Sequence, residues 1–379
     1  MIPFNKPYYS GKEMSSIADA METKILTGDT IILKKCESLL ETKYNFPKVS
    51  LTNSCTIALE MAALLFNIRE GDEVIIPSYT YVSTANAFAL RGARIIFADS
   101  RSDHPGIDED KIEKLVTLNT KAIVVVHYAG VACNMEKIKK IASKFKLFII
   151  EDAAQCIDSF YKGKPLGSIG DIGCFSFHET KNIHCGEGGF ISINNPELFD
   201  RAEIIRNKGT NKSAFLKGEV NKYEWMNLGF SAVPSTLASA FLLSQLRNID
   251  VVQKRRKNIW QYYYKRLDFL CSKGIALPAI PDYATNNAHL FYLVCRNMNE
   301  RDLLIRYLKD NGIQSVFHYQ ALHQSHYFKK NYEGEELPEA DRYSQCIIRL
   351  PLYFDLTETE TGHICDKVIE FYKCSDVRD

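Results

Sequence analysis

The chain of 379 residues lacks the features that mark several classes of protein. No apolar run approaches the roughly 18 residues of a membrane span, and residues 1–6 have no apolar stretch like that of a signal peptide. The 47 basic residues balance the 46 acidic ones, so no bulk field attracts nucleic acid or an anionic membrane. We therefore expect a cytoplasmic protein with no nucleic-acid or membrane partner, in which local geometry holds any bound phosphate.

The eleven cysteines lack the spacing of a disulfide framework or a metal site. Their number is odd, no two are spaced as CxxC, and most stand beside apolar neighbours, for example Cys133, Cys156, Cys174 and Cys295. Scattered cysteines in a long chain are typical of reduced core thiols. We therefore expect free thiols and no metal.

Short apolar segments alternate with amphipathic ones from about residue 47 onward. Strands are predicted at 48–51, 73–76, 94–97, 122–126 and 147–150, with helices between them at 56–67, 81–91, 108–117 and 134–145. Short strands that are apolar on both faces predict a mostly parallel sheet covered by helices, which is an α/β domain. Two more strands, 172–177 and 188–193, and a helix at 196–208 follow.

The pattern changes near residue 245, where a long polar helix is predicted at 244–270. Strands near 289–295, 314–319 and 347–353 and helices near 299–310 and 357–372 indicate a smaller α+β domain. We expect a large domain with an N-terminal arm over 1–245 and a small C-terminal domain over 246–379. The basic run 254–257 fits a solvated helix face better than a nucleotide-phosphate site.

Two charged residues at the ends of predicted strands carry the chemistry. Asp152 lies two positions after the apolar run 147–150, at the end of the predicted strand. Lys181 follows the predicted strand 172–177 after a short segment. A carboxylate there can keep a pyridine nitrogen protonated, and a buried lysine with a lowered pKa can form a Schiff base with an aldehyde. These are the two charges that pyridoxal phosphate needs. Helix capping is the alternative role for Asp152, and an exposed surface position is the alternative for Lys181.

Several polar side chains occupy the neighbouring turns. Ser54, Cys55 and Thr56 open a helix, whose free N–H groups can hold a phosphate, although a plain helix cap also explains them. Tyr81 can stack on a pyridine ring or pack in the core. Gln155 can donate to the phenolic oxygen of the cofactor.

The glycine run 186–189 indicates either a close backbone approach or a simple turn, and it is neither a GxGxxG nor a P-loop sequence. Ser176 precedes Lys181 by five positions. His318 and His323 flank a turn of the smaller domain, where they could bind a substrate or lie as satisfied histidines at the domain interface.

With these residues in hand, the chain resembles the DegT/StrS family of PLP-dependent nucleotide-sugar aminotransferases over nearly its whole length. The resemblance is carried by these strings: Gly71-Asp72-Glu73-Val74-Ile75-Ile76-Pro77-Ser78, Glu151-Asp152-Ala153-Ala154-Gln155, Ser176-Phe177-His178-Glu179-Thr180-Lys181-Asn182 and Gly186-Glu187-Gly188-Gly189. It implies a fold-type-I PLP transferase, with a large α/β domain and a smaller α+β domain. Three further strings narrow the resemblance to members that make dTDP-4-amino-4,6-dideoxygalactose: Val126-His127-Tyr128-Ala129-Gly130, Arg206-Asn207-Lys208-Gly209-Thr210-Asn211 and Phe317-His318-Tyr319.

Residue by residue, the resemblance implies that Lys181 binds the cofactor covalently and that Asp152 pairs with its ring nitrogen. Gln155 meets the phenolic oxygen, Tyr81 stacks on the ring, and the phosphate is held by Ser54, Cys55, Thr56 and Ser176. Family members are homodimers with shared active sites. Relatives carry an asparagine that reaches the partner's phosphate, and Ser231 takes its place here.

The expected reaction moves an amino group from L-glutamate to a dTDP-linked 4-keto-6-deoxyhexose, for surface polysaccharide synthesis. A 3-aminotransferase acting on the 3-keto isomer is the alternative within the family. Sugar 3-dehydrases of the family carry histidine at the position of Lys181, which argues against that activity. A non-catalytic regulatory protein of the same fold is a more distant alternative, and a Rossmann oxidoreductase lacks its glycine fingerprint here.

Overall fold

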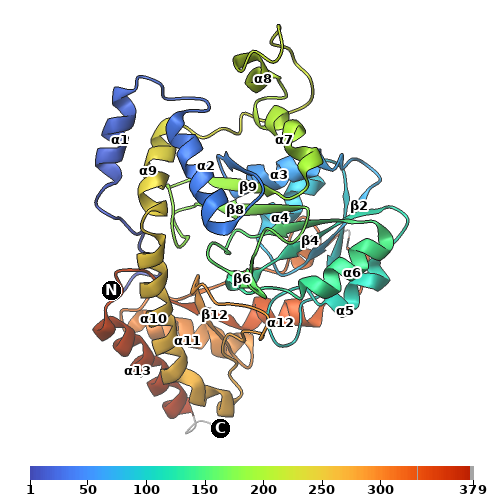
Figure 1. Cartoon of the computed structure of the whole chain (residues 1–379). Helices are drawn as coiled ribbons and strands as arrows, with labels where there is room; N and C mark the ends of the chain where they lie inside the picture. The colour runs from blue at the N-terminus through green and yellow to red at the C-terminus, as the bar shows by residue number, and fades with distance from the viewer. Residues whose placement is uncertain (331, 376–379) are drawn as a thin grey trace.

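The computed structural model describes residues 1–330 and 332–375, and a seven-stranded sheet forms its centre. The strand order is β1-β9-β8-β5-β4-β2-β3 (Figure 1). Their bounds are β1 Val49–Thr52, β2 Glu73–Pro77, β3 Arg94–Ala98, β4 Thr120–Val126, β5 Phe148–Asp152, β8 Ile172–Ser176 and β9 Gly189–Ile193. Strand β9 runs antiparallel to both of its neighbours, and the other pairings are parallel. The predicted mostly parallel sheet is confirmed.

Helices cover both faces of this sheet because alternate strand residues point to opposite sides. Val74 and Ile76 pack in one hydrophobic cluster with α3 (Cys55–Leu65) and α4 (Val82–Ala89). Ile75 packs in the other cluster, with α2 (Ile31–Tyr44), α6 (Met135–Phe145) and α9 (Thr236–Leu246). Burial on both faces explains why the strands read as continuous apolar runs.

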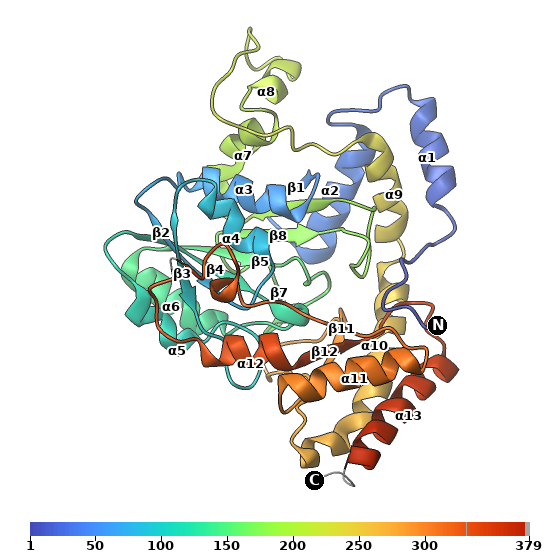
Figure 2. The same ribbon diagram turned by 180° about the vertical axis from the view of Figure 1, so that it is seen from behind.

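The remaining C-terminal chain builds a smaller antiparallel sheet, in the order β10-β12-β11. Its strands are β10 Phe291–Val294, β11 Val316–Phe317 and β12 Ile347–Leu350. Figure 2 shows β12 near the helices α10 (Ile249–Leu267), α11 (Met298–Asp310), α12 (Pro338–Cys346) and α13 (Glu358–Ser375). The first hydrophobic cluster continues from the large sheet into β10 and α12, so the two sheets share a core.

The structure differs from the sequence-based expectation in several elements. The helix expected at 244–270 is two helices, because the Asn248 side chain donates to Ser244 O (2.8 Å) at the end of α9 and competes with the helical bonds. The helix expected at 108–117 is the short α5 (Glu109–Ile112) followed by a 3₁₀ turn. The helices α1 (Glu13–Glu22), α2, α9 and α12 were not predicted as separate elements.

The basic run 254–257 does not form a wholly solvated helix face, and its two arginines bind backbone carbonyls, not an anion. Arg256 is buried and donates to the carbonyls of Ala288 and His289 (3.1 and 2.7 Å). Arg255 donates to the carbonyls of Phe354 and Leu356. The two guanidinium groups therefore tie α10 to loops of the small domain.

The first residues of the chain lie on the small sheet. Ile2 pairs with Ile313, and Phe4 N donates to Gln314 Oε1 (3.1 Å). The N-terminus accordingly lies near α10 and α13 in Figure 1. The ten cysteines whose side chains the structure describes are free thiols, and within 1–330 and 332–375 no helix is long and apolar enough to cross a bilayer.

Candidate active site

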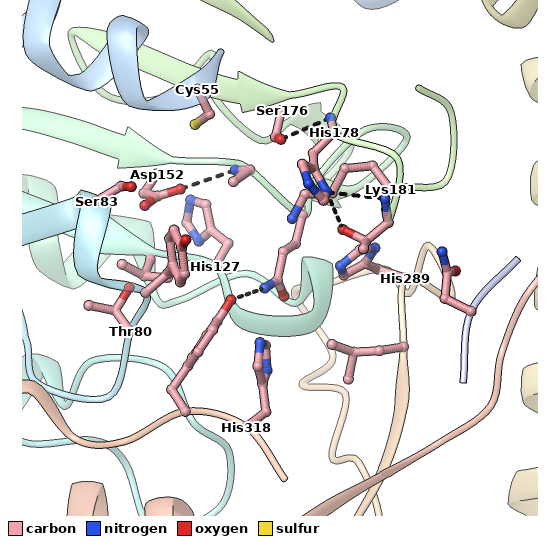
Figure 3. A pocket seen from close by; sticks show the side chains of 18 of the residues that line it. Cys55, Thr80, Ser83, His127, Asp152, Ser176, His178, Lys181, His289 and His318 are labelled. Atoms are coloured by element: carbon pink, nitrogen blue, oxygen red, sulfur yellow. Dashed lines mark hydrogen bonds between the residues drawn. The ribbon is translucent and has the colours of Figure 1, made fainter. Parts of the chain in front are cut away.

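A cavity of about 370 Å³ lies at the carboxyl ends of the large-sheet strands, against the small domain. Turns that follow β1, β2, β4, β5 and β8 line one side, and β12 and the segment around His318 line the other. In parallel α/β sheets, polar side chains at this edge meet because the strands end together. Figure 3 shows Asp152, Ser176, Lys181 and His289 around this space.

Asp152 is the buried carboxylate of the cavity. Its Oδ2 accepts a hydrogen bond from Thr84 Oγ1 (2.7 Å) and its Oδ1 accepts one from Ala154 N (3.2 Å). Burial raises the pKa of the Asp152 carboxyl, and these hydrogen bonds lower it in part. None of the ion pairs within the described residues includes Asp152. The carboxylate is therefore held in place with room for one cationic partner.

Lys181 lies in the turn between β8 and β9, where its backbone N–H donates to His178 O (2.9 Å). Burial lowers the pKa of the Lys181 amine, and the charge of Arg349 lowers it further. Asp152 acts in the opposite direction. A lowered pKa increases the fraction of uncharged amine, which is the form that attacks an aldehyde.

The turn into α3 forms the far end of the cavity. Ser54 caps the helix, with Oγ accepting from Ile57 N (3.2 Å). The first intrahelical bond comes from Ala58 N, so the N–H groups of Cys55 and Thr56 precede it and can bind an anion. Thr56 Oγ1 donates to Ser83 Oγ (2.9 Å), which brings the start of α4 to the same place.

Gly189 of the glycine run allows β9 to pass directly beside this turn. A Cβ at Gly189 would lie 2.6 Å from Cys55 N and 2.4 Å from Phe175 O. No side chain larger than glycine fits there without moving backbone. The close backbone approach considered from the sequence is present at Gly189.

Gln155 and Tyr81 lie on the wall between the two domains. Gln155 Oε1 accepts from Ala129 N (2.6 Å), and its Nε2 donates to Tyr319 Oη (3.2 Å). Tyr81 is 56% exposed, and its ring centroid lies 5.8 Å from that of Tyr319. Tyr81 is therefore not a core aromatic, and it lines the cavity.

The cavity lining includes every predicted site residue except Ser231 and His323. Ser231 is exposed, and its carbonyl accepts from Asn53 Nδ2 (2.7 Å). His323 is buried, with Nδ1 bonded to Ser78 Oγ (2.7 Å) and Nε2 3.4 Å from Asp341. The structure thus places His323 as a satisfied histidine at the domain interface. His318 lines the cavity, with Nδ1 bonded to Tyr128 Oη (3.0 Å).

Thr84, His127, His289 and Arg349 are among the lining or supporting residues that sequence reasoning missed. His127 Nε2 lies 3.0 Å from Glu151 Oε2, and both side chains are fully buried. His289 Nδ1 bonds Asn182 Oδ1 (2.9 Å), which connects the turn after Lys181 to the small domain. Only His127, beside Asp152 at the end of a neighbouring strand, carried a local signal that could have identified it.

These groups fit pyridoxal phosphate. Asp152 would hold the ring nitrogen, the α3 turn would hold the phosphate, and Lys181 would bind the aldehyde carbon. The buried carboxylate without a cationic partner and the close passage of Gly189 are the observations that support this fit.

Residues 9–369 match the model of the DegT/DnrJ/EryC1/StrS aminotransferase family. The chain belongs to this family. A similar sugar aminotransferase has been solved in PLP and PMP forms, which agrees with the chemistry of Asp152 and Lys181. The protein is a PLP-dependent sugar aminotransferase.

Relatives support this assignment over the full length of the chain. The putative sugar aminotransferase Spr1654 from Streptococcus pneumoniae, in its PMP-form, superposes with a TM-score of 0.92 at 26% identity, covering 98% of this chain and 99% of that one. DesV from S. venezuelae gives a TM-score of 0.89 at 28% identity, covering 98% of each chain. The uncharacterized protein MJ1066 of Methanocaldococcus jannaschii is 31% identical over 97% of this chain and 96% of its own length. The expected fold of the family, a large α/β domain with a smaller one, is confirmed.

Proposed function

We propose that the enzyme transfers the amino group of L-glutamate to a dTDP-linked 4-keto-6-deoxyhexose and so forms dTDP-4-amino-4,6-dideoxygalactose. Glutamate becomes 2-oxoglutarate, and the ketone carbon of the sugar gains the nitrogen. The sugar and its nucleotide are inferred from the resemblance of particular sequence strings. The chemistry is supported by Asp152 and Lys181 in one cavity.

The single observation that carries the substrate proposal is the meeting of two of those strings in space. Val126-His127-Tyr128-Ala129-Gly130 follows β4, and Phe317-His318-Tyr319 belongs to the small domain. Tyr128 Oη and His318 Nδ1 are 3.0 Å apart although 190 positions separate them in sequence. His127, His318 and Tyr319 line the same cavity as Lys181. Sequence strings that resemble those of the 4-aminotransferases in the family therefore form the wall that a sugar would contact.

Pyridoxal phosphate, when bound, would supply an aldehyde carbon that takes up and releases the amino group, and a ring that withdraws electrons from the reacting carbon. Asp152 keeps the ring nitrogen protonated, and Thr84 and Ala154 orient its carboxylate. Gln155, held by Ala129 N, presents its amide donor to the same wall.

Lys181 is the acid–base residue of both half-reactions. Its Nζ removes a proton from the amino-bearing carbon of glutamate, and later returns a proton to the sugar carbon that gains nitrogen. Burial favours this role, because it lowers the pKa of the amine and so increases the fraction that is uncharged. His318 and His289 remain neutral beside it, since burial lowers the pKa of both imidazoles well below the usual value.

The enzyme acts as a homodimer with shared active sites. This part of the proposal is supported by the segment around α8 (Lys212–Leu216), which stands away from the body at the top of Figure 1. Seven large apolar side chains are exposed along it, and such a patch marks an interaction surface; they are Phe215, Leu216, Val220, Tyr223, Trp225, Met226 and Leu228. Ser231, at the base of the segment, takes the place of the asparagine by which relatives reach the partner's phosphate. Sedimentation velocity of the holoenzyme would give a monomer mass if this is wrong.

The test of the substrate is product analysis with pyridoxal phosphate, glutamate and dTDP-4-keto-6-deoxyglucose. We expect incorporation of nitrogen by mass spectrometry and an axial amine at C4 by NMR. Turnover only after a 3,4-ketoisomerase is added would instead assign the enzyme to the 3-aminotransferases, with the roles of Asp152 and Lys181 unchanged.

A further inference from the structure

Glu151 and His127 form a buried pair of side chains at the carboxyl edge of the large sheet, and the proposed function gives this pair no role. His127 follows β4, and its backbone N–H donates to Asp152 O (3.3 Å), which extends the pairing of β4 with β5 by one residue. Both side chains are fully buried, and His127 Nε2 lies 3.0 Å from Glu151 Oε2. Figure 3 shows His127 next to Asp152 in the cavity wall. A buried carboxylate is costly unless its surroundings satisfy it.

Four donors satisfy the carboxylate of Glu151. Besides the His127 ring, the backbone N–H of Gly167 donates to Oε2 (2.8 Å). The backbone N–H groups of Ile169 and Gly170 donate to Oε1 (2.7 and 2.6 Å). Because hydrogen bonds to a charged oxygen are strong, the turn 167–170 holds the carboxylate of Glu151 in one orientation. Glu151 therefore offers the His127 ring a fixed acceptor.

The neighbours of the His127 ring determine which of its nitrogens carries hydrogen. The backbone N–H of Cys133 donates to Nδ1 (3.2 Å), so Nδ1 is an acceptor. The hydrogen is therefore on Nε2, which donates to Glu151 Oε2. A hydrogen bond at one ring nitrogen sets the state of the other, so the tautomer and the ring plane are both fixed. Glu151 thus holds His127, and His127 holds the backbone at Cys133.

The segment between His127 and Cys133 is the turn that holds the amide of Gln155. Within it, Ala129 has a φ of +59°, which residues with a Cβ rarely adopt. In this conformation Ala129 N donates to Gln155 Oε1 (2.6 Å). Because an N–H group faces the oxygen of the amide, the NH₂ end of Gln155 points to Tyr319 Oη and the cavity. A strained turn persists only where its surroundings hold it, and the bonded ring of His127 does so at its two ends.

We propose that Glu151 and His127 are positioning residues for the cofactor, which act through the turn 128–133 on the amide of Gln155. Glu151 fixes the His127 ring, the ring fixes the turn, and the turn aims the amide N–H of Gln155 at the phenolic oxygen of pyridoxal phosphate. This inference rests on the proposed function and on the role of Gln155 that the family resemblance implies. A donor that is ordered in advance binds an anionic oxygen better than one that must first be ordered.

The absorbance of the bound cofactor reports this contact without any turnover. A hydrogen bond donated to the phenolic oxygen stabilises its negative charge, so the bound cofactor loses its proton, and changes its absorbance, at a lower pH. In the purified holoenzyme, Gln155→Leu removes the donor. We expect it to raise the midpoint of this pH titration by about one unit.

Two substitutions of His127 separate its two contacts. His127→Asn keeps an acceptor at the position of Nδ1 and removes the donor to Glu151. His127→Gln keeps a donor at the position of Nε2 and removes the acceptor for Cys133 N. Because the pair acts as a unit, both variants should raise the midpoint by roughly half a unit, in the direction of Gln155→Leu. The affinity of the cofactor-free protein for pyridoxal phosphate should fall about threefold in both, which is the same effect in another measurement.

His104→Asn is the matched control. His104 is also buried, and its Nδ1 also accepts a backbone N–H, that of Gly106 (3.0 Å), but it does not line the cavity. Urea unfolding will show how much stability each histidine variant loses. The absorbance midpoint should stay at the wild-type pH in His104→Asn. An equal shift in this control would show that the midpoint follows loosened packing, and it would overturn the proposal.

The remaining outcomes decide between the parts of the argument. A shift in Gln155→Leu with none in the two His127 variants would overturn the positioning role of the pair, and a shift in His127→Gln alone would overturn the part of Glu151. If the His127 variants do not fold, Ala129→Val disturbs the same turn, because a β-branched residue resists a positive φ; an unmoved midpoint there also overturns the proposal.

The proposed function fails in a different way. An unmoved midpoint in Gln155→Leu would refute the role of Gln155, and the inference with it. Failure of the wild type to bind pyridoxal phosphate would refute the proposed function itself.

Discussion

Thr84 gives the sharpest test of how the site holds its cofactor. Its side chain is fully buried, and its hydroxyl donates to Asp152 Oδ2 at 2.7 Å. The Thr84→Val variant keeps the shape of the side chain and removes this donor. A hydrogen bond to a charged acceptor contributes about 1.5–3 kcal/mol. At about 1.4 kcal/mol per tenfold, the affinity for pyridoxal phosphate should fall about 10- to 100-fold.

The same change has a pH signature. The hydrogen bond from Thr84 lowers the pKa of the Asp152 carboxyl, against burial that raises it. Without this bond the carboxylate is lost at a higher pH, so the acid limb of cofactor binding should move upward by about one unit for each ~1.4 kcal/mol removed. The shift would not follow from a packing defect, which changes no proton affinity.

Equilibrium titration of the cofactor-free protein, followed by absorbance, measures both effects. Thr84→Ser is the control, because it keeps the hydroxyl and should bind within about threefold of the wild type. If Thr84→Val binds the cofactor as the wild type does, with the same acid limb, then the Asp152 carboxylate does not hold the ring nitrogen in the way argued.

Three further results are expected. Lys181→Ala should slow single-turnover transfer at least about 100-fold, since the proton carrier is lost; wild-type turnover in rapid mixing would contradict its role. Gly189→Ala places a Cβ 2.6 Å from Cys55 N, so the phosphate turn must shift and cofactor retention on dialysis should fall more than about tenfold. Burial lowers the pKa of the His289 imidazole well below 6.5, so below that pH the unfolded chain binds more protons than the native one. Stability should therefore fall on acidification by up to ~1.4 kcal/mol per pH unit. Urea unfolding of His289→Gln should show a smaller slope, with the exposed His363→Gln as control, and an unchanged slope would count against a neutral buried His289.

The sequence predicted the α/β part of the fold well for a physical reason. Strands such as β4 and β5 are buried on both faces, so their apolar runs are short and continuous. Asp152 ends one such run and Lys181 follows another by a short turn, and a charge at this position is visible without any knowledge of packing. The turn of Ser54 at the start of α3 is equally local.

Other features were not visible because they depend on distant parts of the chain. The break between α9 and α10 depends on one side chain, Asn248, in an otherwise continuous helical pattern. Whether His318 or His323 enters the cavity follows from how the small domain packs on the large one, since five positions separate two similar sequence contexts. Thr84 is polar within a short helix and acquires its role only because β5 ends beside it.

The sequence alone thus determined the reaction class and the cofactor, and it predicted Asp152 and Lys181 as the residues that carry the chemistry, because local strings and residue types at the ends of strands are visible without packing. Only the tertiary structure decided which side chains surround them. Arg349 reads as an ordinary strand residue between apolar neighbours, and nothing local shows that its Nε is buried without a hydrogen-bond partner. That property arises because β12 lies against the edge of the large sheet and against the N-terminal arm. Residues hundreds of positions apart in the sequence make these contacts.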